Sequence, residues 1–338
     1  MRAWTVAANG EPGDVLDLVE VAVPEPGPGQ VAIEVSACGL NFADVLLCRG
    51  GYQEKPPLPF TPGIELAGVV AVVGSGVDAS LVGRRVVALP ALPRGGLAEV
   101  CLADAGSVSP LPDDVDDIAA AAITITYGTA WLGLFRRGGL RAGDTVLVHA
   151  AAGASGAAAV QLAAATGARV LATAGGPGKV AEALGHGADV AWNSRADGFE
   201  LVELVRAETG GRGVDVVFDP VGGDLFDTSR RVVAFEGRYV VIGNASGRVP
   251  ELPTNHLLVK NYAVLGFHFG LYRTEAPEVL AEALASVMDL VSTGRLSPAV
   301  GDVHPLESAG DALVSLAAGT TTGKQVVEIT PRTVREEP

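Results

Sequence analysis

The sequence contains few cysteines and few aromatic residues, and it lacks the features of an exported protein. Its three cysteines, Cys38, Cys48 and Cys101, cannot form a closed set of disulfides, and aromatic residues make up only 5% of the chain. The start, MRAWTVAANGEPGD, has no basic segment followed by an apolar one, as a signal peptide would have. These absences argue against a disulfide-stabilised secreted protein and favour a cytoplasmic one.

Positive charge is also scarce, with 24 Lys and Arg against 39 Asp and Glu and a net charge of −15. Nucleic acids and anionic membrane surfaces attract clusters of basic side chains, so both are disfavoured as partners. The stretch 118–135 is uncharged and reaches the minimal length of a membrane span, but its Ala, Thr and Gly content predicts a buried helix near a domain junction. A length of 338 residues suits two domains.

The segment 145–156, TVLVHAAAGASG, is typical of a strand, a tight turn and a helix. Its first four residues are those of a buried parallel strand, and residues 153–165 form a small-residue helix that ends at Gly167. Ala151, Gly153 and Gly156 occupy the positions of G-x-G-x-x-G, with Ala in place of the first glycine. Such small residues admit a pyrophosphate to a helix N-terminus. The pattern indicates a dinucleotide site; the alternative is a close helix–strand contact without a ligand.

The rest of the middle segment alternates strands with helices. This alternation predicts a doubly wound parallel sheet, in which ligands bind outside the carboxyl ends of the strands. Glycine-rich loops at 221–223 and 243–247 follow two of the strands. The expected strands are 169–173, 189–192, 214–219 and 238–243, and the expected helices lie around 179–184 and at 199–209.

The choice of dinucleotide follows from a missing acid. NAD sites usually carry an acidic residue about 20 positions after the glycines, which holds the ribose 2′-hydroxyl. Residues 156–180 contain no Asp or Glu, and the loop 173–179 consists of small residues and one cation, Lys179. The loop would accept a 2′-phosphate, so NADPH is favoured over NADH. The alternative for Lys179 is a solvated lysine in the first turn of a helix.

The two ends of the chain follow a different pattern. Residues 1–110 alternate apolar and polar positions in short runs between Pro and Gly clusters, which predicts an antiparallel, barrel-like β domain. The segment 110–114, PLPDD, marks a crossing point. After Tyr262 we expect a return to the first domain, through a strand at 263–269, helices at 277–293 and 306–318, and a closing strand at 325–329.

Several motifs together carry a family resemblance: GLNFAD at 39–44, RGGY at 49–52, PGIELAG at 62–68, VGSGV at 73–77, TAW at 129–131, the HAAAG turn, Lys179 and GK at 323–324. Over essentially its whole length the chain resembles the zinc-independent quinone oxidoreductases of the medium-chain dehydrogenase/reductase superfamily. The resemblance implies an α/β fold, with a doubly wound Rossmann domain inserted into a GroES-like β-barrel catalytic domain and NADPH held in the cleft. The expected boundaries are 1–120 for the catalytic domain, 121–262 for the Rossmann domain, and 263–338 for a sheet-edge strand and the return.

Two departures from the zinc alcohol dehydrogenases of that superfamily bear on the chemistry. Those enzymes carry Cys where this chain has Asn41 and His where it has Ile64, and a catalytic zinc needs three protein ligands. The scattered cysteines also provide no structural zinc cluster, so we predict no metal. Without a Lewis acid, oxidation of an unactivated alcohol loses its alkoxide stabilisation. Reduction of a quinone or a conjugated carbonyl by hydride from NADPH is therefore favoured.

The resemblance also implies which residues hold the cofactor. They are Asn41, Thr129, Ala152, Gly153, Ala154, Ser155, Gly175, Lys179, Ser194, Gly243, Asn244, Phe267 and Lys324. Ala154 and Ser155 replace the family's usual Gly and Val, and the Ser155 hydroxyl could donate to the pyrophosphate. Ser194 stands where a tyrosine is often found near the adenosine phosphate, so the preference for NADPH could be weaker than the family's.

Asn41 and Tyr52 are the candidate catalytic residues. The resemblance places Asn41 beside the nicotinamide, where its amide could both donate and accept a hydrogen bond; the alternative is a helix N-cap. Tyr52 is the phenol nearest that loop in sequence and could donate a proton to a developing enolate, or its ring could simply pack. We expect Asp44 and Glu65 to be structural and His149 to be a core histidine.

Three classes of function remain. The first is an NADPH-dependent reductase of quinones, enones or alkenals, and the second is an enoyl-thioester reductase. The third is a non-catalytic dinucleotide-binding protein, against which Asn41, Tyr52, Thr129 and Lys179 argue. The apolar strand 263–269 would be an aggregation hazard at a sheet edge, and the resemblance implies that such strands pair across a two-fold axis. We therefore expect a homodimer.

Overall fold

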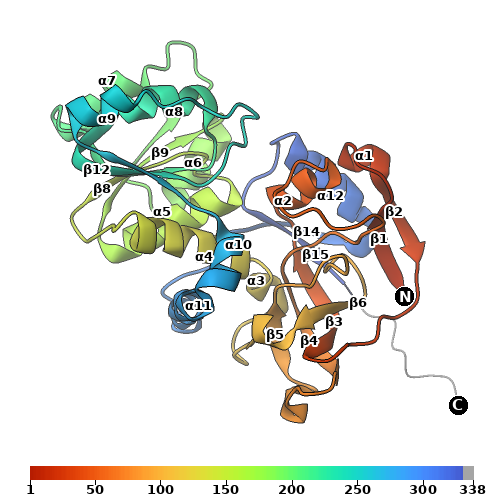
Figure 1. Cartoon of the computed structure of the whole chain (residues 1–338). Helices are drawn as coiled ribbons and strands as arrows, with labels where there is room; N and C mark the ends of the chain where they lie inside the picture. Colours follow the sequence, from red (N-terminus) through yellow and green to blue (C-terminus); the bar gives the residue numbers. More distant parts are fainter. Residues whose placement is uncertain (330–338) are drawn as a thin grey trace, which may run out of the picture. The chain divides into compact units, whose positions relative to one another are not determined.

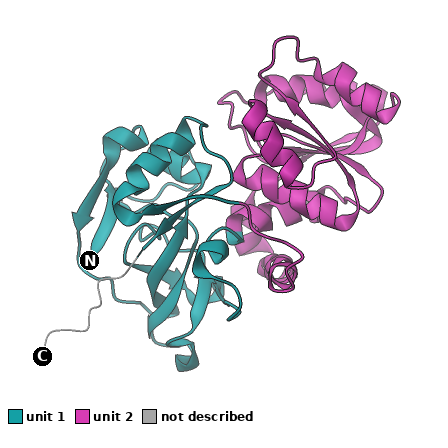
Figure 2. Cartoon of the chain, turned by 180° about the vertical axis from the view of Figure 1, so that it is seen from behind, with its two compact units in different colours: residues 1–124, 300–338 teal, residues 125–299 magenta. Residues whose placement is uncertain are grey.

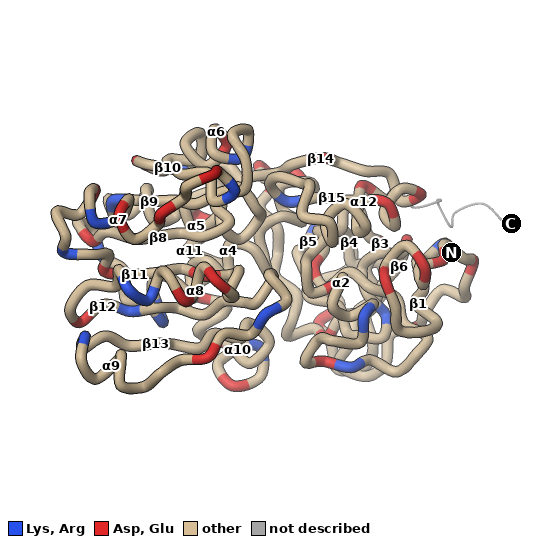
Figure 3. The backbone as a smooth tube through the Cα atoms, turned by 90° about the horizontal axis from the view of Figure 1, so that it is seen from above, with Lys and Arg blue, Asp and Glu red and all other residues tan. Residues whose placement is uncertain are grey.

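The computed structural model describes residues 1–329, which form two compact units (Figures 1 and 2). Unit 1 consists of Met1–Thr124 and the chain from Val300 onward, and unit 2 is Ile125–Ala299. Lys and Arg are interspersed with Asp and Glu along the chain (Figure 3). No helix in the described part of the chain is long and apolar enough to cross a membrane.

Unit 1 is built on β-sheets. A two-stranded antiparallel sheet pairs β1 with β2, and a larger sheet has the order β14-β15-β3-β4-β5-β7, with β6 paired to β3. Its ladders are antiparallel except for β14 with β15. The strands are β1 (Arg2–Val6), β2 (Leu16–Glu20), β3 (Gln30–Gly39), β4 (Leu66–Val73), β5 (Arg85–Ala88), β6 (Val100–Asp104), β7 (Val108–Pro110), β14 (Val300–Pro305) and β15 (Lys324–Glu328), and the helices are α1 (Pro12–Val15), α2 (Phe42–Cys48), α3 (Asp117–Ala120) and α12 (Ala309–Ala317).

The core of unit 1 follows the two-residue period of its strands. Val31, Ile33 and Val35 of β3 point to the same face and are fully buried, and Leu313 of α12 belongs to the same apolar cluster. Both ends of the chain thus contribute to one core, as the pattern of the sequence predicted.

Unit 2 is a doubly wound parallel sheet in the order β10-β9-β8-β11-β12-β13. Helices α7, α8 and α9 lie over one face, and α4 and α5 over the other (Figure 1). The strand order reverses between β8 and β11, which is where such sheets bind ligands. The strands are β8 (Thr145–Val148), β9 (Arg169–Ala174), β10 (Val190–Asn193), β11 (Val214–Asp219), β12 (Val233–Val241) and β13 (Ala263–Gly266), and the helices are α4 (Thr124–Trp131), α5 (Ala154–Thr166), α6 (Pro177–Gly185), α7 (Leu201–Thr209), α8 (Gly223–Ser229), α9 (Thr254–Lys260), α10 (Phe269–Glu275) and α11 (Pro277–Ser292).

The predicted fold class is confirmed, with three local differences. The strand expected at 263–269 ends at Gly266, and Phe269 begins α10. Because β13 pairs with β12, the second unit extends to Ala299, beyond the predicted boundary at 262, and it begins at Ile125. The buried stretch 118–135 is divided among α3, α4 and a π-helix at Leu132–Arg137. Helix α3 ends in a tightened turn, in which the N–H groups of Ala122 and Ile123 each bond to the carbonyl three residues earlier.

Candidate functional site

The turn between β8 and α5 has the shape that a pyrophosphate requires. Gly156 packs so closely on the preceding turn that a Cβ there would lie 2.1 Å from the carbonyl oxygen of Ala150. Gly153 is the N-cap of α5, and its N–H donates to the same oxygen at 2.8 Å. The first N–H groups of a helix have no partner inside it, and its dipole favours an anion there. The turn therefore fits a dinucleotide phosphate.

The loops after β11 and β12 are held together at the same edge of the sheet. One carboxylate oxygen of Asp219 accepts the backbone N–H groups of Val221 at 2.8 Å and Gly222 at 3.0 Å. A Cβ on Gly222 would lie 2.5 Å from the side-chain oxygen of Asn244, which places Asn244 against this loop. Gly243, next in the chain to Asn244, donates its N–H to the Asp219 carbonyl at 3.3 Å.

His149 lies beneath this edge as a core residue. Its ring is fully buried, with Nδ1 2.8 Å from the Thr173 hydroxyl and Nε2 2.6 Å from the Ser229 hydroxyl. Burial lowers the pKa of the imidazole, so the ring is neutral at pH 7. The prediction of a core histidine is confirmed.

Two cations lie near the carboxyl ends of β9 and β10. Lys179 is in the first turns of α6, and Arg195 follows β10. The Arg195 guanidinium covers Gly175, where a Cβ would lie 2.9 Å from Nε. Burial and the neighbouring charge of Arg195 lower the pKa of Lys179. The two positive charges repel each other, and a bound anion would relieve that repulsion.

The backbone around these cations is fixed by Asn193. Its side-chain oxygen accepts the N–H groups of Gly176 at 2.8 Å and Arg195 at 3.0 Å. The Ser194 hydroxyl donates to the Ala174 carbonyl at 3.2 Å. The sequence pointed to Gly175, Lys179 and Ser194 at this place, and Arg195 was missed. The signal that points to Arg195 is its position directly after a parallel strand, at the edge where ligands bind.

In unit 1, Asn41 belongs to a compact polar cluster with Glu65 and Lys324. The Lys324 ammonium donates to the Asn41 side-chain oxygen at 2.6 Å and also to Glu65. The Asn41 Nδ2 group donates to Glu65 Oε1 at 2.9 Å and to the Gly39 carbonyl at 3.1 Å. Lys324 and Glu65 are almost completely buried, whereas Asn41 is partly exposed.

Asp44 fixes the backbone next to this cluster. Its carboxylate accepts the backbone N–H of Asn41 at 2.8 Å and that of Gly63 at 2.9 Å. Burial raises the pKa of the Asp44 carboxyl to about 6, although both N–H groups favour its charged form. These bonds give Asp44 the structural role that the sequence suggested.

The geometry refines the expectation for Asn41. Asn41 is the N-cap residue of α2, so the capping alternative describes its position correctly. Its side chain, however, bonds to Glu65, Lys324 and the Gly39 carbonyl, and these contacts occupy both N–H groups of the amide. The amide thus both donates and accepts, as expected, but its partners are protein groups, and towards a ligand its remaining capacity is to accept.

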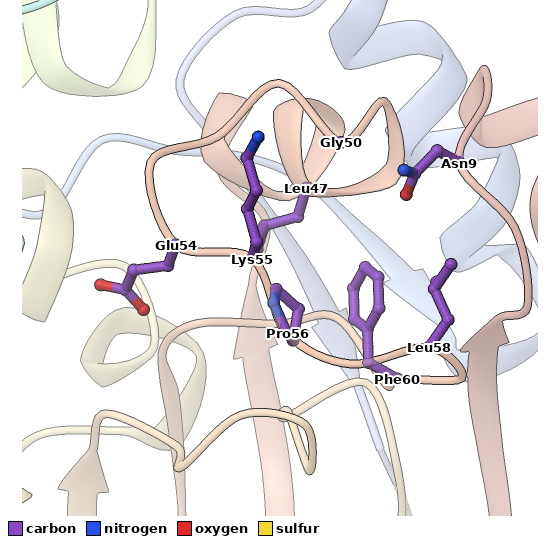
Figure 4. A pocket seen from close by; sticks show the side chains of 8 residues that line it. All are labelled: Asn9, Leu47, Gly50, Glu54, Lys55, Pro56, Leu58 and Phe60. Atoms are coloured by element: carbon purple, nitrogen blue, oxygen red, sulfur yellow. The ribbon is translucent and has the colours of Figure 1, made fainter.

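Tyr52 belongs to a different group of residues. Its ring, like Ile64, packs against a small apolar cluster that includes Leu47 and Phe60. A pocket of about 230 Å³ adjoins this cluster (Figure 4). Ligand pockets typically span about 300 to 1,000 Å³, so this one is too small for a dinucleotide. Its lining residues are Asn9, Leu47, Gly50, Glu54, Lys55, Pro56, Leu58 and Phe60.

The remaining predicted residues lie in unit 2. Thr129 is buried in α4, and Phe267 stacks on Tyr272 with ring centroids 5.7 Å apart. Ala152 is buried beside the turn, while Ala154 and Ser155 are partly exposed at the start of α5. Residues 1–329 contain no group of three or more His, Cys, Asp and Glu that could hold a metal ion.

Two family models match the chain. The model described as an alcohol dehydrogenase GroES-like domain matches residues 27–113, and the one described as a zinc-binding dehydrogenase matches residues 154–286. The matches fall in the two units that the structure separates.

Known proteins resemble the chain over nearly its whole length. "Quinone oxidoreductase-like protein 2" of Bos taurus is 39% identical over 315 residues, which cover 92% of this chain and 89% of that protein. The crystal structure of Escherichia coli quinone oxidoreductase complexed with NADPH has 32% identity and a TM-score of 0.89, covering 97% of this chain and 100% of that chain. The phthioceranic/hydroxyphthioceranic acid synthase of Mycobacterium tuberculosis is 36% identical over 327 residues, or 94% of this chain but 15% of the synthase.

Proposed function

Because the chain belongs to the quinone oxidoreductase family of the medium-chain dehydrogenase/reductase superfamily, we propose that it is an NADPH-dependent, zinc-independent reductase of quinones or α,β-unsaturated carbonyl compounds. The observation that carries the proposal is the pair of cations, Lys179 and Arg195, after the strands next to the glycine turn, together with the lack of Asp and Glu in residues 156–180. We also place the reaction in the cytoplasm, because the three cysteines are free thiols.

The cofactor would be held by groups that the fold presents in advance. The first turn of α5, from Ala154, receives the pyrophosphate, and Lys179 and Arg195 bind the 2′-phosphate with charge-assisted hydrogen bonds. The E. coli quinone oxidoreductase structure contains NADPH, which supports this choice of cofactor. When bound, NADPH supplies the hydride that reduces the substrate.

In the reaction, negative charge develops on the substrate's carbonyl oxygen as its far carbon is reduced. We assign Tyr52 as the donor of the proton that neutralises this charge, with its ring held by the cluster around Phe60. Ile64 cannot ligate a metal, and Asn41 is engaged by Lys324, so the assignment uses no Lewis acid.

An enoyl-thioester reductase is the second candidate. It is favoured by the similarity of nearly the whole chain to one segment of a mycobacterial acid synthase. Both functions transfer a hydride to a conjugated carbon. They differ because an enoyl-thioester reductase must also accommodate the thioester-linked group of its substrate.

A substrate panel tests both. Quinones, enones, alkenals and enoyl thioesters are each mixed with the protein and NADPH, and the loss of NADPH absorbance is followed. We expect turnover of a quinone or an enone. Turnover restricted to thioesters would transfer the assignment to the second candidate, and NADPH binding without any turnover would favour a non-catalytic protein.

We also propose that the protein is a homodimer joined through β13. This strand is at the edge of the parallel sheet, where its outer backbone groups would otherwise face solvent. Phe235 on the adjacent strand is 71% exposed, and Leu258 and Val259 of α9 are each 78% exposed. A second copy paired across a two-fold axis would cover these side chains.

Light scattering at micromolar concentration checks the dimer. We expect the mass of two chains for the unaltered protein and of one chain for Leu258→Glu, with Val72→Glu, at an exposed position of unit 1, as the control. A monomeric mass for the unaltered protein would refute this arrangement.

A further inference from the structure

We propose that Lys324 is a positioning residue that, together with Glu65, locks the Asn41 amide in an acceptor-only orientation. Asn41 then receives a hydrogen bond from the cofactor and cannot donate one to the substrate's developing oxyanion. The inference rests on the proposed function, and it assigns separate roles to Asn41 and Tyr52.

The chemistry of its neighbours fixes which end of the Asn41 amide is which. An ammonium has only donors, so the atom 2.6 Å from Lys324 Nζ must be the amide oxygen. A backbone carbonyl only accepts, so the atom 3.1 Å from the Gly39 oxygen must be the amide nitrogen. The second N–H points to Glu65 Oε1 at 2.9 Å. Rotating the amide by 180° would turn all of these contacts into clashes of like groups.

The fold brings Lys324 to this place from the far end of the chain. β15 runs antiparallel to β3, and Lys324 begins β15 close to the end of β3 at Gly39. A Cβ on Gly39 would lie 2.8 Å from Lys324 Cε and 2.1 Å from the Ala121 carbonyl oxygen, so glycine is required for the lysine stem to pass.

Burying the Lys324–Glu65 ion pair carries a large desolvation cost, so the pair is a poor source of folding stability. Lys324 is 1% exposed and Glu65 is 0% exposed, and removing two such charges from water costs several kcal/mol per ion. A buried pair of this kind can specify one arrangement of its neighbours. The neighbour that it orients here is the partly exposed amide of Asn41.

An acceptor-only Asn41 limits what it can bind. The substrate's oxyanion has no proton to donate, so Asn41 cannot stabilise it. The nicotinamide end of NADPH carries ribose hydroxyls and a carboxamide N–H, all of which donate. Asn41 therefore fixes the orientation of the hydride donor, and the donor to the oxyanion is a different group.

Two variants separate the lock from the charge. In Glu65→Gln, the Gln oxygen still accepts from Lys324 and Asn41, so the lock survives. In Lys324→Met/Glu65→Gln, no ammonium faces the Asn41 oxygen, and the Gly39 carbonyl is the one partner named here that still opposes rotation of the amide. The control is Arg169→Met/Glu208→Gln, which makes the corresponding two substitutions at a more exposed ion pair in unit 2.

We compare kcat, substrate KM and the NADPH Kd in all three variants, with melting temperature to establish folding. Relative to Glu65→Gln, we expect the double variant to lose about 10- to 100-fold in kcat, because small misplacements of reacting groups cost up to that much. We expect its NADPH Kd to weaken about 2- to 10-fold, the value of one neutral hydrogen bond. The loss should be equal for quinone and enone, with substrate KM unchanged, since it acts through the cofactor.

Equal kcat and equal NADPH Kd in Glu65→Gln and the double variant would overturn the proposal and leave the pair a purely structural role. A loss in kcat that differs between quinone and enone would also overturn it, because Asn41 would then act on the substrate. If the unaltered protein reduces no substrate, the proposed function fails, while the comparison of NADPH Kd values still tests the lock.

Discussion

Lys324 and Lys179 are both predicted to serve the cofactor, yet the two regions that contain them use charge in opposite ways. Lys324 is buried and neutralised by Glu65, and we propose that its ammonium serves to orient the Asn41 amide. Lys179 lies beside another cation, Arg195, and its lowered pKa reflects burial and that repulsion. The Lys324 charge is neutralised inside the protein and positions its neighbours, whereas a bound anion would ease the repulsion between Lys179 and Arg195.

The largest effect expected in unit 1 concerns Tyr52, whose proton-donor role depends on Asn41 being unable to donate. A positioned proton donor contributes about 10²- to 10⁴-fold in rate, so Tyr52→Phe should lower kcat with an enone by that range and leave the NADPH Kd nearly unchanged. A quinone should be affected much less, because water can protonate its reduced anion. An equal modest rise in KM for both substrates, with kcat untouched, would mean that the Tyr52 ring only packs.

The part of the site that sequence predicts well is the part with local determinants. The glycine turn and α5 lie within residues 145–166, and strand and helix periodicity was sufficient to place them. The Asn41 cluster could not be derived in this way, since Lys324 is 283 residues from Asn41 and meets it only through the pairing of β15 with β3. Arg195 is an intermediate case for prediction from sequence, because the pairing of β10 with β9 is what brings it toward Lys179.

Stability measurements test the contrast between Lys324 and Lys179. Lys324→Met leaves Glu65 buried without its partner, and breaking a buried pair in this way costs about 3 to 5 kcal/mol. Lys179 is only partly buried and has a like charge beside it, so Lys179→Met should change the free energy of unfolding by no more than about 1 kcal/mol. Urea unfolding of both variants checks the difference. Similar losses in the two variants would show that the comparison is wrong.

The second half of the contrast is tested by cofactor affinity. Each charge-assisted hydrogen bond to the 2′-phosphate is worth about 1.5 to 3 kcal/mol, so Lys179→Ala and Arg195→Ala should each weaken NADPH binding by that amount. NADH lacks the phosphate, so its affinity should stay the same or rise as the cation repulsion is removed. Nucleotide fluorescence titrations with both cofactors provide the measurement. Equal affinities for NADPH and NADH in the unaltered protein would refute the assignment of both cations.

The smallest expected effect is that of removing metal ions, and it tests whether the Asn41 cluster replaces a metal site. In this cluster an ammonium, an amide and a carboxylate satisfy one another, and Ile64 offers no ligand atom. A catalytic zinc needs three protein ligands and an open position, whereas binding at this cluster would have to displace the Lys324 ammonium from Glu65. We therefore expect dialysis against a chelator to leave kcat and KM unchanged, and elemental analysis of the purified protein to find no stoichiometric zinc. Activity that is lost with the chelator and restored by zinc would contradict this expectation and would require the Lys324–Glu65 pair to open in the working enzyme.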